Sequence, residues 1–349
     1  MATKIHFLHE NNKYYWAPNR STPSAKNSIA ELTEIISYLK KNKVNIKKAV
    51  NELKTVRDFV RFGVSKFNQH KIYFGHGTDN SWDEAVYLVL YALNLPRDID
   101  TSVLDARLTS EEKKNVLDYI KKRIEKRVPA AYLTHEAWFA GKAYFVDERV
   151  LIPRSPIAEL IEKEFAPWIE PEKVWRILDV GTGSGCIAIA CAHAFPDALV
   201  DAVDNSSAAL KVAEKNIASH DVGERVMLIK SDVFDEVPPQ EYDIIVSNPP
   251  YVSTGEMKTL PSEYYHEPRN ALVAGHDGMA IITRILKDAC DYLTPHGILV
   301  IETGNSDEVV AEQFPHLPFL WLEFERGGGG VFLLTAEQLR KHREQLETQ

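Results

Sequence analysis

An apolar run that leads into three closely spaced glycines constrains the fold of this chain more than any other feature. Arg176-Ile-Leu-Asp-Val-Gly181 has strand character, continues as Thr-Gly-Ser-Gly185, and is followed by a helical run from Cys186. Glycine lets the backbone turn sharply and lets a ligand approach the main chain. The spacing G-x-G-x-G differs from the G-x-G-x-x-G pattern of dinucleotide sites, so it suits a ligand without a pyrophosphate. A plain Gly-rich turn between strand and helix is the alternative.

Strands and helices alternate over the second half of the chain. Short runs rich in Val, Ile and Leu alternate with runs of helical periodicity between residues 155 and 340. This pattern predicts an α/β fold with a mostly parallel, seven-stranded sheet, helices on both faces, and ligands bound beyond the carboxyl ends of the strands. The expected strands are 176–181, 199–204, 226–230, 242–247, 297–302, 319–324 and 330–335, and the expected helices are 186–195, 207–220 and 278–293.

The first half of the chain has a different pattern. Apolar residues recur at helical spacing, which predicts an all-helical domain over residues 29–128. Short aromatic and β-branched runs around Gly141 predict a β-hairpin linker over residues 129–153. The other expected parts are a loose arm (1–28), the sheet domain (154–340) and a C-terminal tail (341–349).

Composition limits the class of partner. The 349 residues are enough for two domains, and 41 Lys and Arg against 50 Asp and Glu give a net charge of −9. Because phosphate contacts need positive charge, this balance favours a small-molecule or basic-protein partner, although one face could still be basic and bind nucleic acid. Three cysteines without a C-x-x-C pair indicate a reduced, cytoplasmic chain. No segment has the length and apolarity of a signal peptide or a membrane span.

Two aspartates follow later strands. Asp204 ends the second expected strand, about 20 positions past the glycines, where an acidic residue can accept hydrogen bonds from ribose hydroxyls. Such a charge-assisted bond contributes about 1.5–3 kcal/mol. Alternatively Asp204 caps the helix from Ser207, and it can do both. Asp232, after the third expected strand, is either a contact for the exocyclic amine of an adenine or a turn residue.

Asn248-Pro-Pro-Tyr251 directly follows the fourth expected strand and is the most specific motif. Two prolines give a rigid backbone without amide donors. The Asn248 side-chain oxygen and the Pro249 carbonyl can therefore accept both N–H bonds of one planar –NH₂ group, while Tyr251 packs on its face. Such a nitrogen is a poor nucleophile, and positioning can supply about 7–11 kcal/mol of a barrier. The motif predicts a methyl acceptor that is an amide or aromatic amine, with an ordinary Pro-Pro turn as the alternative.

The remaining polar and sulfur-bearing residues suggest structural roles. Cys186, Cys191 and Cys290 are expected to fill the core within helices. The basic residues between Lys121 and Arg127 are expected to form the solvated face of a helix. His266 has no role that the sequence assigns, and no metal-ligand motif is found in the sequence.

Together, the glycine motif and Asn248-Pro-Pro-Tyr251 resemble a class I methyltransferase that uses S-adenosylmethionine (SAM). Within that group the chain resembles the protein-glutamine methyltransferases, which methylate the side-chain amide nitrogen of a Gln in a translation protein. The resemblance covers roughly residues 50–340 and implies a Rossmann-like fold, SAM as cofactor and S-adenosylhomocysteine as product. Supporting stretches are Arg127-Val-Pro-Ala-Ala-Tyr-Leu133, Phe145-Val-Asp-Glu-Arg-Val-Leu-Ile-Pro-Arg154 and Gly275-His-Asp-Gly278.

Two branches of this family differ in one stretch. Where the release-factor branch carries Pro-Arg-Pro-Glu-Thr-Glu, this chain reads Pro153-Arg-Ser-Pro-Ile-Ala-Glu159. That departure matches the branch that acts on ribosomal protein L-three of the large subunit. Other matching stretches are Gly75-His-Gly-Thr-Asp-Asn80, Trp82-Asp-Glu-Ala85, Leu260-Pro-Ser-Glu-Tyr264, His266-Glu-Pro268 and Trp321-Leu-Glu-Phe-Glu-Arg-Gly-Gly328.

The resemblance implies a role for each motif. The donor site would be made by the glycines, three aspartates and the edge of the acceptor motif. SAM would lie on Gly181, Gly183 and Gly185, with Asp179 near its amino-acid portion, Asp204 at the ribose, Asp232 near the adenine and Asn248 beside it. Asn248 and the Pro249 carbonyl would hold the Gln amide, and Tyr251 would orient it. Transfer would be direct, without a metal or a covalent enzyme intermediate, and the helical domain would recognise a basic ribosomal protein.

Three alternatives remain open at this point. Adenine also presents an –NH₂ next to an sp² carbon, so an adenine-N6 DNA methyltransferase fits Asn248-Pro-Pro-Tyr251, although it must grip phosphates and the net charge is −9. The release-factor branch is the second alternative. A SAM-binding protein without catalytic activity is the third, against which the complete motifs argue.

Overall fold

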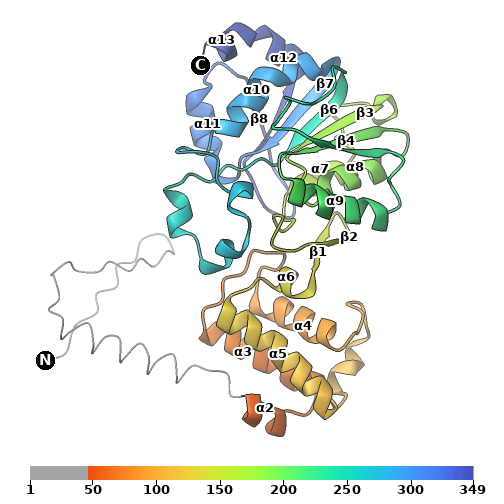
Figure 1. The fold of residues 1–349 in the computed structure, drawn as a ribbon, viewed down its shortest axis with the longest axis vertical. Helices are drawn as coiled ribbons and strands as arrows, with labels where there is room; N and C mark the ends of the chain where they lie inside the picture. The colour runs from red at the N-terminus through yellow and green to blue at the C-terminus, as the bar shows by residue number, and fades with distance from the viewer. Residues whose placement is uncertain (1–45, 349) are drawn as a thin grey trace, which may run out of the picture. The chain divides into compact units, whose positions relative to one another are not determined.

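The computed structural model describes residues 46–348, which belong to one compact unit. The expected arm at 1–28 and the first part of the expected helical domain, residues 29–45, lie outside the described residues. Within the described chain the elements run from a group of helices through a hairpin to a sheet flanked by helices, as predicted (Figure 1).

The first elements are helices that pack on one another. They are α2 (Ile46–Glu52), α3 (Val56–Gln69), α4 (Ser81–Ala92), the 3-10 helix η1 (Thr101–Asp105) and α5 (Ser110–Lys126). Polar caps begin four of them, since Thr55, Asn80, Asp100 and Thr109 accept backbone N–H groups of the first turn. The periodic apolar residues, such as Phe59 and Phe67, are buried between α3, α4 and α5.

One expectation about α5 is wrong. Arg123 does not lie on a solvated face, because its side chain is fully buried. Its guanidinium donates hydrogen bonds to the carboxylate of Glu84 at 2.6 Å and to the carbonyl of Tyr73 at 2.7 Å. A buried arginine is stable only when its donors are satisfied, and these partners come from segments that the helical periodicity of α5 does not reveal.

The expected hairpin is present and is preceded by a short helix. Helix α6 (Ala130–Thr134) leads into β1 (Glu136–Phe139) and β2 (Lys142–Phe145), which pair antiparallel. Ala140 and Gly141, with φ of 45° and 72°, form the two-residue turn, whose positive φ matches the twist of a hairpin.

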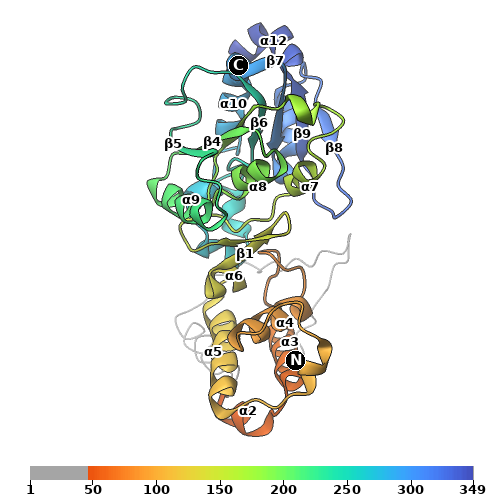
Figure 2. The ribbon, with the colours of Figure 1, turned by 90° about the vertical axis from the view of Figure 1, so that its right-hand side faces the viewer.

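The second half forms the predicted seven-stranded sheet (Figures 1 and 2). Five strands are parallel neighbours, and β9 runs antiparallel to both strands beside it. In sheet order the strands are β5 (Val226–Lys230), β4 (Leu199–Asp204), β3 (Arg176–Val180), β6 (Tyr242–Ser247), β7 (Leu293–Glu302), β9 (Val331–Thr335) and β8 (Leu320–Leu322). Strand β7 begins earlier than expected because Leu293 still pairs with Tyr242, before a register shift brings Ile298 opposite Ile244.

Helices cover both faces of the sheet, as the alternation predicts. Alternate strand residues such as Ile177 and Leu178 belong to different apolar clusters, one with α7 and α8, the other with α10 and α12. The helices are α7 (Ile157–Glu162), α8 (Cys186–Ala194), α9 (Ser207–Ser219), α10 (Ala280–Tyr292), α11 (Asp307–Gln313), α12 (Ala336–Lys341) and α13 (Arg343–Glu347). The sequence had not predicted α7, α11, α12 or α13, which are five to seven residues long and too short to show a clear period.

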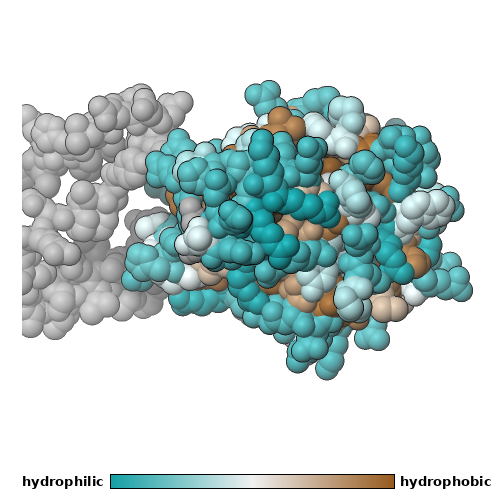
Figure 3. Space-filling view, turned by 90° about the horizontal axis from the view of Figure 1, so that it is seen from above, coloured by the Kyte–Doolittle hydropathy of each residue, from teal (hydrophilic) through white to brown (hydrophobic). Residues whose placement is uncertain are grey.

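The surface and the cysteines complete the description. The face in Figure 3 is mostly hydrophilic, with small separated apolar areas. No helix within residues 46–348 combines the length and the apolarity needed to cross a membrane. Cys186, Cys191 and Cys290 are unpaired and buried, as expected. The division into domains at residues 128 and 153 stays a prediction.

Candidate active site

A cavity of about 330 Å³ lies at the carboxyl ends of the central strands. Its size is typical of a small-molecule site. Six of the predicted site residues line it, each from the end of a strand or the turn after it: Gly181, Gly183, Asp204, Asp232, Asn248 and Pro249. Parallel strands place their carboxyl ends at one edge, which explains why residues so far apart in the sequence meet here.

The glycine turn is shaped by its own backbone. Gly181, Gly183 and Gly185 have φ of 78°, 56° and 81°, a region that residues with a Cβ rarely adopt. A Cβ on Gly181 or Gly183 would meet no atom within 4 Å, so the space above them is open to a ligand. Gly185 differs, because an added Cβ would lie 3.2 Å from Ala213 Cβ. Its role in the structure is therefore the close packing of α8 on α9, and it does not line the cavity.

Asp204 joins the glycine turn to the start of α9. Its Oδ2 accepts the Gly183 N–H at 2.9 Å and its Oδ1 accepts the Ser206 N–H at 2.8 Å. Burial raises the pKa of Asp204, while these two backbone donors oppose that rise. Ser206, and not Asp204, is the N-cap of α9, since its side chain accepts the Ala209 N–H. Each carboxylate oxygen of Asp204 keeps a lone pair that can accept a hydrogen bond from a ligand.

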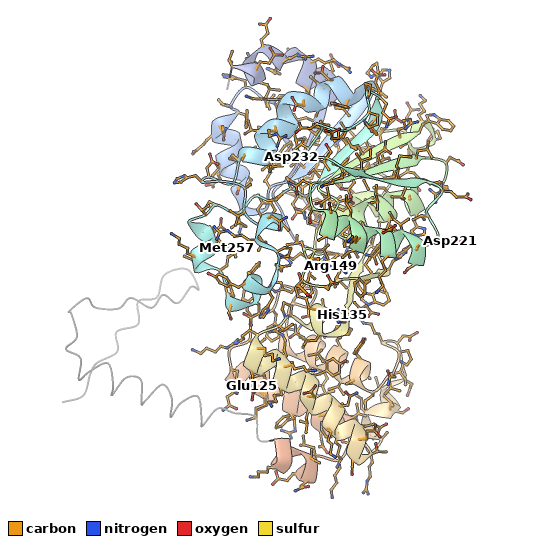
Figure 4. All side chains as sticks on the ribbon, viewed as in Figure 1. Glu125, His135, Arg149, Asp221, Asp232 and Met257 are labelled. Carbon is orange, nitrogen blue, oxygen red and sulfur yellow. The ribbon has the colours of Figure 1, made fainter. Side chains whose placement is uncertain are left out.

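Asp232 reaches the same cavity from the end of β5 but is held by an ion pair. Arg284 Nη1 of α10 lies 2.9 Å from its Oδ2, and both side chains are partly exposed. Figure 4 labels Asp232 at this edge of the sheet and Arg149, another lining residue, nearer to the helices of the first half of the chain. The ion pair leaves the other carboxylate oxygen available to a ligand.

Asp179 lies beneath the glycine turn and outside the cavity lining. It is fully buried, and its Oδ2 accepts the Thr182 hydroxyl at 2.6 Å and the Ala188 N–H at 3.1 Å. Its Oδ1 is buried without a hydrogen-bond partner. Burial raises the pKa of Asp179 to about 7, so this carboxyl is partly protonated near neutral pH.

The acceptor motif stands at the end of β6. Ser247 donates to the carbonyl of Val180, which ties the end of β6 to the start of the glycine turn. Asn248 and Pro249 line the cavity, and no group within residues 46–348 hydrogen-bonds to the Asn248 side chain. Its amide oxygen is therefore available to a ligand.

Tyr251 lies behind the cavity and contacts a residue that sequence reasoning missed. Its ring packs on Gly304, where an added Cβ would come within 2.5 Å of the ring. Its hydroxyl donates to Glu302 Oε1 at 3.4 Å, and the Ser155 hydroxyl donates to Glu302 Oε2. Glu302 ends β7, the neighbour of β6, and burial raises its pKa to about 6. The rule that polar residues at strand ends converge could have found Glu302.

The described part of the chain has no preformed metal site. Between residues 46 and 348 no group of three or more His, Cys, Asp and Glu side chains is placed to hold an ion. His266 lies outside the cavity lining, where its Nε2 lies 2.8 Å from the carbonyl of Lys126.

Known proteins match this chain over most of its length. The family model of the methyltransferase small domain matches residues 165–276. A ribosomal protein uL3 glutamine methyltransferase of Francisella tularensis subsp. tularensis is 48% identical over 296 residues, which cover 84% of this chain and 94% of that protein. Its counterpart in Neisseria gonorrhoeae is 50% identical over 292 residues, which cover 83% and 97%. This chain belongs to the ribosomal protein uL3 glutamine methyltransferase family.

Membership of the uL3 glutamine methyltransferase family confirms the predicted class of enzyme, a SAM-dependent protein-glutamine methyltransferase, and the predicted branch. Among solved structures, a ribosomal protein L11 methylase of Lactobacillus delbrueckii subsp. bulgaricus matches with a TM-score of 0.36 and 19% identity, over 52% of this chain and 76% of that chain. A likeness of that size carries no argument about this chain.

Proposed function

We propose that this chain transfers a methyl group from SAM to the side-chain amide nitrogen of a glutamine in ribosomal protein uL3, in the cytoplasm. The observation that carries the proposal is the 48–50% identity to uL3 glutamine methyltransferases along nearly their whole length. The cavity at the strand ends, with Asn248 and Pro249 in its wall, supports it independently.

The residues around the glycine turn fit SAM. The open space over Gly181 and Gly183 suits an uncharged part of a ligand, and the buried, unpartnered Oδ1 of Asp179 is a polar atom that the fold leaves unused. We assign Asp204 to the ribose hydroxyls and Asp232 to the region of the adenine, with Gly185 supporting the turn. When bound, SAM supplies an electrophilic methyl group on a sulfonium ion.

Asn248, Pro249 and Tyr251 are assigned to the acceptor. Two oxygens, from the Asn248 side chain and the Pro249 carbonyl, accept the two N–H bonds of the glutamine amide and fix its plane. The lone pair of the nitrogen, normally delocalised into the carbonyl, is thereby directed at the methyl donor. Tyr251 holds the motif from behind through Glu302 and Gly304. The proton of the alkylated amide needs no dedicated base, because that cation is a strong acid.

The partner of the enzyme is a basic protein. Residues 129–349 contain 35 acidic and 18 basic residues, whereas residues 46–128 contain 12 acidic and 16 basic. The negative charge therefore belongs to the part of the chain that holds the cavity, where it attracts a basic ribosomal protein and repels bare nucleic acid. We assign the recognition of the protein substrate to the helices of residues 46–128, and its electrostatic attraction to residues 129–349, because the helices carry a small excess of basic residues.

Incubation of the enzyme with SAM carrying a labelled methyl group, and with a lysate whose uL3 lacks the modification, tests the function. We expect label in one large-subunit protein with the mass of uL3. Label in DNA, or in release factors only, would identify one of the alternative substrates and contradict the proposal. An absence of label in every fraction would indicate a protein that binds SAM without catalysis.

A further inference from the structure

The segment after Asn248-Pro-Pro-Tyr251 forms one wall of the cavity. Residues 252–275 connect β6 to α10 and contain the 3-10 helices η3 (Glu256–Thr259), η4 (Ser262–His266) and η5 (Arg269–Ala271). Val252 pairs with Val273, so the segment leaves the sheet and returns to its starting point. Asn270, Val273 and Gly275 line the cavity together with Asn248 and Pro249, and Val273 pairs with Val252 shortly after them. The position of this segment therefore shapes the acceptor side.

A buried glutamate at the far end of this segment binds the helices of the first half. Glu263 has a side chain that is 1% exposed, and its Oε1 accepts the Tyr73 N–H at 3.2 Å. The same oxygen lies 3.3 Å from Arg123 Nη1 and 3.3 Å from Arg127 Nη1, both at the end of α5. Arg123 is itself buried against Glu84 of α4. Figure 4 labels Met257 in the segment and Glu125 in α5, the two elements that this cluster joins.

A second buried glutamate binds the segment to the stretch of chain that leads into α7. Glu267 accepts the Ile152 N–H at 3.0 Å and two N–H groups of Arg154 at 2.6 and 2.8 Å. His76 Nε2 lies 3.4 Å from its Oε2, without the alignment of a hydrogen bond. Burial alone would raise the pKa of Glu267, but Arg154 and His76 lower it to about 2, so it stays ionised. Arg154 also lines the cavity.

Buried ion pairs of this kind add little to the stability of the fold, but they fix the positions of the segments that they join. Removing two charges from water costs about as much as their attraction returns, so an apolar cluster of similar volume would be as stable. A charged cluster accepts one geometry only, because any other leaves a charge without a partner. The carboxylates of Glu263 and Glu267 thus fix the segment at two points, one on the helices and one beside the cavity.

We propose that Glu263 and Arg123 are positioning residues for methyl transfer: their ion pair fixes residues 252–275 against α5, so that the segment closes the acceptor side of the cavity in one geometry. The proposal rests on the proposed function for its kinetic readout. It concerns the acceptor side only, since the hydrogen bonds of Asp204 go to Gly183 and Ser206 and to no member of this cluster. Displacing an acceptor by a fraction of an ångström is enough to slow a reaction.

Glu263→Gln in the full-length enzyme tests the proposal, because it keeps the shape and one acceptor oxygen but removes the charge. We expect the turnover number on uL3, counted per SAM-binding site from calorimetry, to fall about 10- to 100-fold. The dissociation constant of SAM should stay unchanged. Arg123→Lys, which keeps the charge but cannot reach all three acceptors, should behave alike. Glu170→Gln, which breaks the exposed ion pair of Glu170 with Lys173, is the matched control and should leave turnover unchanged.

Three results would overturn the proposal. One is an unchanged turnover per SAM-binding site in both variants. Another is a loss of SAM-binding sites with normal turnover at those that remain, which is what a purely structural role predicts. The third is unchanged hydrogen exchange at residues 256–272 in Glu263→Gln, a measurement that needs no substrate. We expect faster exchange there and not at residues 181–206. If the wild-type enzyme failed to methylate uL3, the proposed function would be wrong while this exchange result still decided the positioning role.

Discussion

The two sides of the cavity are built in different ways. On the donor side, the Gly181 N–H donates to the carbonyl of Val203 and the Gly183 N–H donates to the carboxylate of Asp204, so the turn is held by the end of the adjacent strand. On the acceptor side, Glu263 and Glu267 are held by arginines more than 100 positions away in the sequence. The first side is set by a short stretch of chain, whereas the second requires the helices and the sheet to be assembled. This difference predicts that SAM binding and methyl transfer can be damaged separately.

Asn248→Ala should have the largest effect, and on transfer alone. Loss of one of the two oxygens that hold the amide leaves the nitrogen free to rotate, so turnover should fall at least about 100-fold. The SAM dissociation constant measured by calorimetry should stay close to that of the wild type. A parallel loss of SAM binding would show that Asn248 belongs to the donor side, and the separation of the two sides would fail at this residue.

Asp204→Ala should have the converse effect. Losing a charge-assisted hydrogen bond to the ribose costs about 1.5–3 kcal/mol, which is a 10- to 100-fold weaker binding of SAM. Asp204→Asn, which keeps an acceptor oxygen, should lose less. Calorimetry with both variants measures this, and an unchanged dissociation constant would restrict Asp204 to a structural role at the start of α9.

Glu302→Gln sharpens the comparison through the stability of the acceptor side. Folding raises the pKa of Glu302 from 4.5 to about 6. Between pH 4.5 and 6 the folded chain therefore keeps the proton of Glu302, whereas the unfolded chain has lost it. Folding stability contributed by this group is therefore present below pH 4.5 and is lost as pH rises through about 6. The variant should gain about 2 kcal/mol relative to wild type between pH 4.5 and 7.

Urea unfolding across that pH range measures the gain. Glu337→Gln, at an exposed position in the first turn of α12, is the control and should show no such trend. If the difference in unfolding free energy between Glu302→Gln and wild type did not change with pH, the pKa of Glu302 would not be raised in the folded chain, and this prediction would be wrong.

Salt should have the smallest effect. Positions 129–349 hold 35 acidic and 18 basic residues, and this negative excess attracts a basic substrate. Dissolved ions screen the attraction beyond about 10 Å at 0.1 M salt. Initial rates at low uL3 concentration should fall several-fold as salt rises, while SAM binding should change little. Rates that do not depend on salt would show that electrostatic attraction does not bring uL3 to the enzyme.

Sequence reasoning reached the donor side because its signals are local. The glycines follow a recognisable strand, Asp204 ends the next one, and parallel strands bring such ends together, so Gly181, Asp204 and Asn248 could be predicted to share a site. The same reasoning gave the seven-stranded sheet, the hairpin and the helices before them. Gly185 shows the limit of this approach, since it contacts Ala213 of another helix rather than the cavity.

The contacts that hold the acceptor side in place were missed for a physical reason, although Asn248 and Pro249 themselves were predicted and line the cavity. Arg123 lies in a run of basic residues, and although it falls at helical spacing from Val116 and Ile120, no local signal shows what would satisfy its donors. It is buried because Glu84 and Glu263, from two distant segments, satisfy its donors. Ser155 and Glu302 likewise gain their relation to Tyr251 only in the folded chain. Pairing between side chains that are far apart in the sequence has no period and no motif, so only the folded structure reveals it.

The position of the methyl group in the product tests the central claim most directly. Purified, unmodified uL3 is incubated with the enzyme and SAM, digested, and sequenced by tandem mass spectrometry. The account predicts one modified residue, a glutamine that carries a single methyl group on its side-chain nitrogen, and no modification with Asn248→Ala. A methyl group on any other residue type, or uL3 that stays unmodified while a release factor or adenine in DNA is methylated, would contradict it.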